Sequence, residues 1–189
     1  MRGDILLVTG IHRVELAFGD HVASGPGMPQ VMRIPHGIAR PRRGPGDAFL
    51  SRTQHREIYL QLYQQIAGRY RLVIDLHQGL DEAGRSAEIF CNDSQFLARC
   101  EARLACRSDR LNARLVRIAA PASGAETTPE PRGATDAAAY TWIPRKLWEG
   151  RAPLYVGVEV YLPRDGEGED DDWSFGRDLI GEICACVSD

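Results

Sequence analysis

Short apolar segments alternate with longer helical stretches along the chain, and this alternation constrains the fold more than any other feature. Such a pattern is typical of an α/β domain with a mainly parallel sheet. We expect one domain over residues 1–189, with a mostly parallel (mixed) central sheet flanked by helices. The predicted strands are 4–9, 30–34, 71–76, 86–91, 113–118 and 154–162, and the predicted helices are roughly 13–23, 47–67, 94–106, 137–149 and 174–186.

The composition is that of an ordinary globular protein, with 43% hydrophobic and 26% charged residues. A formal charge of -3 gives no general attraction to nucleic acid or anionic membranes. No apolar stretch approaches the roughly 20 residues that span a bilayer, and the first apolar run is too short for a signal peptide. We therefore expect a cytoplasmic protein with no nucleic acid or membrane partner and with its five cysteines reduced. The oligomeric state stays open.

The clearest predicted helix is the second, over residues 47–67, where Asp47 is a candidate N-cap and Gly68 can end the helix. For the last predicted helix, Asp172 or Ser174 is the candidate cap. The apolar stripe that the sequence predicts for the second helix consists of Phe49, Ile58, Leu62 and Ile66.

Two histidines and a glutamate follow apolar runs at the ends of predicted strands. The run over 72–76 leads directly into His77, and the first strand is followed by His12 with Glu15 three residues on. The carboxyl ends of parallel strands form the crevice where ligands collect in open α/β sheets. Two imidazoles and one carboxylate are the protein ligands of a catalytic zinc site with an open fourth position. The sequence therefore predicts a metal site made of His12, Glu15 and His77.

A third polar feature is Glu159, in the middle of the strongest predicted strand, residues 154–162. A glutamate held near a metal can act as general base and then as general acid. Asp75 should point to the same face as His77, because side chains alternate along a strand. There it could orient an imidazole from outside the ligand shell.

Structural explanations for these residues stay open beside the functional ones. A His-x-x-Glu pair is short enough to occur by chance, and His12 could instead cap the following helix. His77 could be a hydrogen-bonded histidine at a strand end, and Glu159 could lie on a solvated face. In that case the chain is an α/β domain with no metal.

These residues resemble the zinc carboxypeptidase superfamily, most closely its succinylglutamate desuccinylase/aspartoacylase branch. In that family a His-x-x-Glu motif after the first strand and a later strand-end histidine hold zinc, and a late glutamate handles protons. By position, the resemblance makes His12, Glu15 and His77 the zinc ligands and Glu159 the catalytic residue. The most specific match is Asp75-Leu76-His77, which resembles the family's Asp-Leu-His sequence.

The chain departs from the family pattern in two places. Arg13-Val14 replaces the family's Gly-Asn between the histidine and the glutamate, which changes the expected pocket wall. The family's Asn-Arg pair, which grips a substrate carboxylate, is missing. Arginines of the Pro/Gly/Arg-rich loop over 35–46 are candidates for that task, because guanidinium binds carboxylates in a bidentate manner. The candidates for substrate binding are Arg40 and Arg43, with Arg42 beside them. His21, His36 and His55 stay unassigned, and of these we expect His36, which lies in this loop, to reach the pocket.

The resemblance implies a zinc-dependent hydrolase that cleaves an amide bond of a small N-acyl amino acid or a short peptide-like substrate. The alternatives within the same chemistry are a metallocarboxypeptidase and an N-formyl amino acid amidohydrolase. A different class of function, a non-catalytic binding protein on the same fold, is favoured by the missing Asn-Arg pair, whereas the presence of Glu159 favours an enzyme.

Overall fold

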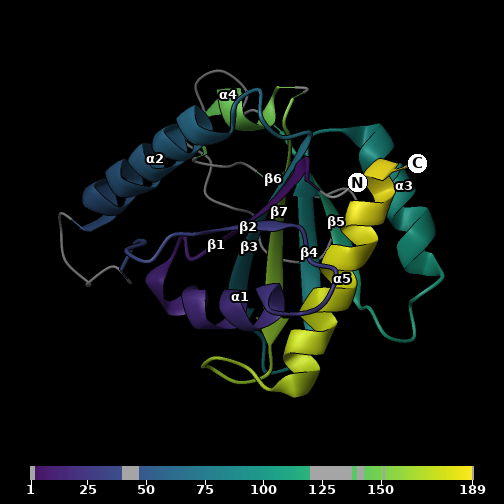
Figure 1. Cartoon of the computed structure of the whole chain (residues 1–189). Helices are drawn as coiled ribbons and strands as arrows, with labels where there is room; N and C mark the ends of the chain where they lie inside the picture. Colours follow the sequence, from purple (N-terminus) through teal and green to yellow (C-terminus); the bar gives the residue numbers. More distant parts are fainter. Residues whose placement is uncertain (1–2, 40–46, 120–137, 140–142, 151, 189) are drawn as a thin grey trace.

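The computed structural model describes residues 3–39, 47–119, 138–139, 143–150 and 152–188. In these residues a central sheet of seven strands is flanked by helices (Figure 1). The strands are β1 (Ile5–Thr9), β2 (Gln30–Arg33), β3 (Leu72–Leu80), β4 (Ser86–Cys91), β5 (Ala113–Ile118), β6 (Ala138–Ala139) and β7 (Leu154–Leu162). The helices are the 3-10 turn η1 (Arg13–Glu15) and the α-helices α1 (Leu16–Ala23), α2 (Asp47–Ile66), α3 (Ser94–Ala105), α4 (Arg145–Trp148) and α5 (Asp170–Ser188).

The sheet has the strand order β2-β1-β3-β7-β4-β5-β6. Neighbouring strands run parallel except β4 and β7, which pair antiparallel. The expected mostly parallel, mixed α/β sheet is therefore confirmed. The late strand β7 lies in the middle of the sheet, where it pairs with β3 along its whole length.

Two apolar layers cover the two faces of this sheet. On one face, α1, α3 and α5 pack against the sheet through side chains such as Phe18, Phe96 and Leu179. On the other face, α2 and α4 pack through Leu62 and Trp148, among others. Because side chains alternate along a strand, the face beneath α2 also receives residues 73, 75 and 77 of β3. The side chains of Asp75 and His77 therefore lie on the α2 side of the sheet.

Most predicted elements agree with the structure within a few residues, but the helix predicted over 137–149 is wrong. Residues 138–139 instead form β6, which pairs parallel with the end of β5. Within the described residues of this region, only α4 is helical, and it begins directly after Pro144. Proline disfavours helical backbone in the residue before it, so a helix could not run through this position easily.

The two best predicted helices differ from expectation in detail. The fully buried residues of α2 include Tyr59, Leu62 and Ile66, whereas Ile58 is only half-buried. The last helix begins earlier than predicted, at Asp170. Its Asp172 caps the helix from within the first turn, where its Oδ2 accepts a hydrogen bond from the backbone N–H of Glu169 at 2.9 Å.

No helix in the described ranges combines the length and the apolar character that crossing a membrane would require.

Candidate metal centre

A tight turn after β1 brings His12 and Glu15 to the carboxyl end of the sheet. Gly10 adopts a φ of +83°, and a side chain there would meet the Ile34 carbonyl oxygen at 2.7 Å, so the turn requires glycine. The backbone at His12 then forms an isolated parallel bridge with Ile38. The single turn η1 follows and carries Glu15 back toward the sheet. The positions of His12 and Glu15 are thus fixed by the backbone geometry of this turn as well as by their spacing in the sequence.

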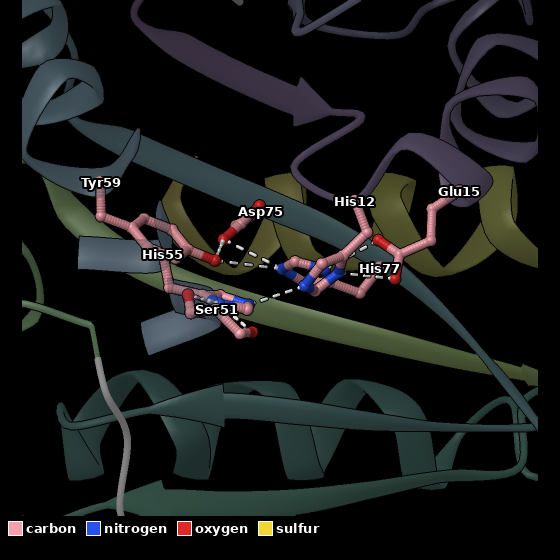
Figure 2. Close-up of polar contacts among 7 residues, drawn as sticks. All are labelled: His12, Glu15, Ser51, His55, Tyr59, Asp75 and His77. Atoms are coloured by element: carbon pink, nitrogen blue, oxygen red, sulfur yellow. Dashed lines mark hydrogen bonds and ion pairs between the residues drawn. The ribbon is translucent and has the colours of Figure 1, made fainter. Parts of the chain in front are cut away.

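The side chains of His12, Glu15 and His77 converge at this edge (Figure 2). Nδ1 of His12 lies 2.8 Å from Oε1 of Glu15, and Nδ1 of His77 lies 3.0 Å from Oε2 of the same carboxylate. The strand β3 runs directly beside β1, which is why His77 can contact a carboxylate 62 positions away in sequence. The sequence predicted these three residues as one site, and the structure brings them together.

The group also fits a zinc ion by chemistry and by spacing. Its potential ligand atoms all lie within 4.8 Å of one another. Zinc bonds of about 2.0–2.2 Å in a tetrahedral site separate the ligand atoms by about 3.3 Å, so only small side-chain shifts would close the shell. Imidazole nitrogens and a carboxylate oxygen are ligands that zinc prefers in catalytic sites. The three residues could therefore hold a zinc ion.

Asp75 contacts the nitrogen of the His77 ring that faces away from Glu15. It is fully buried, and its Oδ2 accepts hydrogen bonds from the hydroxyls of Tyr59 and Tyr155, each at 2.7 Å. Nε2 of His77 lies 3.1 Å from the same oxygen. The imidazole thus lies between two carboxylates, with Nδ1 facing Glu15 and Nε2 facing Asp75. This is the arrangement expected of a metal-binding histidine whose ring is oriented by a second carboxylate.

Charge compensation sets the pKa values in this cluster. Burial alone would lower the pKa of His77, but the Asp75 charge and the hydrogen bonds to Asp75 and Glu15 raise it well above its usual value. Burial would raise the pKa of Glu15, but hydrogen bonds with His12 and His77 outweigh burial and lower it. The carboxylate is thus held ionised at neutral pH, as a metal ligand must be.

Glu159 lies next to His77 across the β3–β7 pair, on the same face of the sheet. Burial raises the pKa of its carboxyl group to about 7, against the opposing influence of the His77 charge. Gly79 leaves the space that this carboxyl group uses, because a Cβ atom there would lie 2.9 Å from Oε1 of Glu159. The strand predicted over 154–162 agrees with this placement.

A cavity of about 590 Å³ borders Glu15 and Gly79. Arg13 and Val14, the two residues between His12 and Glu15, lie in its wall. Arg13 is the one cationic side chain among the described lining residues, and Asp165 and Glu167 of the acidic loop lie in the same wall. Arg13 and the candidate metal ligand Glu15 thus line the same cavity.

The predicted substrate-binding residues Arg40 and Arg43, together with Arg42, lie outside the described residues. His36 is exposed. The histidine that does reach the site is His55 of α2, whose Nε2 lies 2.8 Å from Nε2 of His12 (Figure 2). Burial lowers the pKa of His55, which favours its neutral ring. Sequence reasoning left His55 unassigned, although it lies four residues before the buried Tyr59 on the same helical face.

No protein-family model and no curated protein sequence matches the chain. Among solved structures, murine aminoacylase 3 has a TM-score of 0.51 at 13% identity, covering 99% of this chain and 65% of the aminoacylase chain. The CwlD amidase from Clostridioides difficile, solved in complex with the GerS lipoprotein, has a TM-score of 0.47 at 14% identity, with 97% and 95% covered. A bacteriophage poly-gamma-glutamate hydrolase has a TM-score of 0.45 at 10% identity, with 100% and 84% covered. The chain therefore has the fold of murine aminoacylase 3 and spans 65% of that protein's length.

Proposed function

We propose that this protein is a zinc-dependent hydrolase that cleaves the amide bond of an N-acyl amino acid or a short peptide-like substrate. The observation that carries the proposal is the convergence of two imidazole nitrogens on one carboxylate, with Glu159 beside His77 in the neighbouring strand. The fold shared with an aminoacylase supports the same reaction class.

In this proposal His12, Glu15 and His77 hold the metal ion. A zinc ion bound by such ligands acts as a Lewis acid, which makes water nucleophilic near neutral pH and polarises a carbonyl group. Asp75 keeps the His77 ring in one orientation, and the two tyrosine hydroxyls hold Asp75. The ligands are therefore fixed before substrate arrives, which lowers the reorganisation needed during the reaction.

Glu159 moves the proton. Its carboxylate accepts the proton that the attacking water loses as the new C–O bond forms. The resulting carboxylic acid then donates that proton to the nitrogen of the leaving amine as the C–N bond breaks. Burial raises the pKa of this carboxyl group toward neutrality, which suits a group that must both accept and release a proton near neutral pH.

The substrate binds in the cavity beside Glu15, and Arg13 is the described residue best placed to attract an anionic group there. A guanidinium group can hold a carboxylate through two parallel hydrogen bonds. Arg40 and Arg43 stay predictions for the same task. A substrate of this kind is small and carries its own carboxylate beside the scissile amide.

The metal content of the purified protein tests the proposal. We expect about one zinc ion per chain in the wild type, and its loss in His77→Ala. The matched control is His21→Ala, which removes a histidine that stacks on Trp173 at 3.8 Å, outside the metal group. A wild-type protein that binds no metal even after incubation with zinc would contradict the proposal.

A substrate panel then separates the reaction classes. Hydrolysis of N-acetylated or longer N-acyl amino acids supports the aminoacylase-like reaction. Exclusive cleavage of N-formyl amino acids, or of a peptide's C-terminal bond, selects one of the alternative enzymes. Zinc binding without turnover of any of these would identify a non-catalytic binding protein.

A further inference from the structure

His55 occupies the same face of α2 as Tyr59, one helical turn away. From this face, α2 reaches both histidines of the candidate metal group. Tyr59 donates a hydrogen bond to Asp75, which holds His77, and His55 contacts His12 directly. Figure 2 shows the His55 and Tyr59 side chains lying beside the two imidazole rings.

The hydrogen bonds of His55 fix which of its nitrogens carries the proton. Nδ1 of His55 lies 2.8 Å from the backbone carbonyl oxygen of Ser51. A carbonyl oxygen only accepts hydrogen bonds, so Nδ1 donates. In a neutral ring, Nε2 then has a free lone pair and acts as an acceptor. The only donor in the 2.8 Å contact between the two Nε2 atoms is therefore His12.

This chain of hydrogen bonds indicates that Nε2 of His12 carries a proton. With its proton on Nε2, a neutral His12 presents an unprotonated Nδ1 to Oε1 of Glu15, 2.8 Å away. Two lone pairs cannot face each other at this distance without a cation between them. The arrangement thus prepares Nδ1 of His12, together with the Glu15 carboxylate, to share a positive ion.

We propose that His55 is a positioning residue that holds His12 in the tautomer and orientation required for metal binding through Nδ1. This inference rests on the proposed function, because it assigns His12 as a metal ligand. His55 thereby does for His12 what Asp75 does for His77, with a neutral acceptor in place of a carboxylate.

His55 is not itself a member of the ligand group. Its Nε2 contacts the ring nitrogen of His12 that points away from Glu15. The group of described side chains whose ligand atoms lie within 4.8 Å of one another consists of His12, Glu15 and His77. The effect of His55 on the metal is therefore indirect and passes through the His12 ring.

Two substitutions of His55 separate a positioning role from mere packing. His55→Phe keeps a ring but removes the acceptor, whereas the Oε1 atom of His55→Gln can accept the hydrogen bond from His12. We expect zinc affinity, measured by competition with a chromogenic chelator, to fall about 10–100-fold in His55→Phe. His55→Gln should recover most of this loss. His21→Ala serves as the distant control and should bind zinc as the wild type does.

Thermal unfolding of the metal-free variants shows whether each one folds. If His55→Phe does not fold, the ring nitrogens of the wild type provide the second test. Long-range proton–nitrogen NMR spectra of the zinc-loaded wild type should show His12 bound through Nδ1 and protonated on Nε2.

Unchanged zinc affinity in folded His55→Phe, or a His12 ring bound through Nε2, would overturn the assignment of His55 and leave the proposed hydrolase intact. Equal losses in the Phe and Gln variants would also overturn it, because packing alone would then account for them. A wild type that binds no zinc would remove the proposed function together with this inference.

Discussion

Glu159 is the residue whose environment most directly sets a measurable pH dependence. Burial raises the pKa of its carboxyl group to about 7, and only the ionised form can accept a proton. In the zinc-loaded enzyme the metal charge lowers this pKa, and we expect kcat/KM to fall about tenfold per pH unit below the lowered value. Glu159→Gln should lose about 10²–10⁴-fold in kcat and retain zinc, because the amide cannot take the proton.

The matched control for that substitution is Glu149→Gln, on an exposed glutamate that pairs with Arg145. It should leave both turnover and the acidic limb of the profile unchanged. If the limb near the pKa of Glu159 persisted in a partly active Glu159→Gln enzyme, another group would be the base.

Asp75 offers a second test at the same scale. Asp75→Asn removes the charge that faces Nε2 of His77 while keeping nearly the same shape. We expect zinc affinity, followed by chelator competition, to fall about 10–100-fold. Tyr59→Phe should cost less, since Tyr155 still donates to Asp75. An Asn variant that binds zinc with wild-type affinity would show that the charge of Asp75 does not support the metal ligand.

The candidate site residues could be predicted from the sequence where they follow or interrupt an apolar strand. His12, Glu15, His77 and Glu159 were identified because each follows or interrupts a clear apolar run. His55 was not, because a polar residue in a helix shows its contacts only when the inward face is known. That face is marked by Tyr59, Leu62 and Ile66 rather than by Ile58, so reading it correctly would have placed His55 inside.

At the level of elements, strands were predicted more accurately than helix ends. Buried strands are apolar on consecutive positions, as in β1 and β3, and this pattern is visible without tertiary information. The wrong helix over 137–149 arose because β6 has only two residues, too few for any alternation to appear. The early start of α5 was missed because its first turn is acidic rather than apolar.

The start of α5 supports a stability prediction. Asp172 accepts the Glu169 backbone N–H and pairs with Arg85 at 2.6 Å while being nearly fully buried. The first turn of α5 contains three aspartates, and their negative charge suits the positive end of the helix dipole. Asp172→Ala should therefore reduce the free energy of unfolding by about 1–2 kcal/mol, measured by urea denaturation.

Asp171→Ala is the control for this change, because Asp171 is exposed in the same turn. It should shift the unfolding free energy by less than about 0.5 kcal/mol. Equal losses in both variants would indicate that the dipole, and not the cap of Asp172, accounts for the effect.

For the whole molecule, metal binding and folding should be coupled. The proposed ligands come from the turn after β1 and from β3, which meet only in the folded sheet, so the unfolded chain offers zinc no assembled site. A zinc concentration of about 1,000 times Kd should then stabilise the protein by about 4 kcal/mol. Differential scanning calorimetry with zinc or with a chelator measures this as a rise in Tm. His77→Ala should show a much smaller rise.

Strand order was beyond the reach of sequence reasoning. The alternation of elements indicated a mainly parallel sheet, but nothing in it told where β7 would pair or that β4 would run antiparallel to β7. These pairings depend on how apolar faces far apart in sequence pack together. The pattern of apolar residues along the chain is compatible with many strand orders. The proximity of Glu159 to His77 was consequently an expectation from the family resemblance, and the structure supplies the pairing behind it.

The central place of β7 has a consequence for how the protein is made. His12, Glu15, His55, Asp75 and His77 all precede residue 80, whereas Glu159 enters the sheet between β3 and β4 near the end of the chain. A ribosome therefore delivers the proposed metal ligands and their supporting side chains, His55 and Asp75, well before the proposed proton-transferring group. During translation, the nascent chain therefore has all the groups proposed to bind a metal ion before it has the glutamate proposed to use that ion in catalysis.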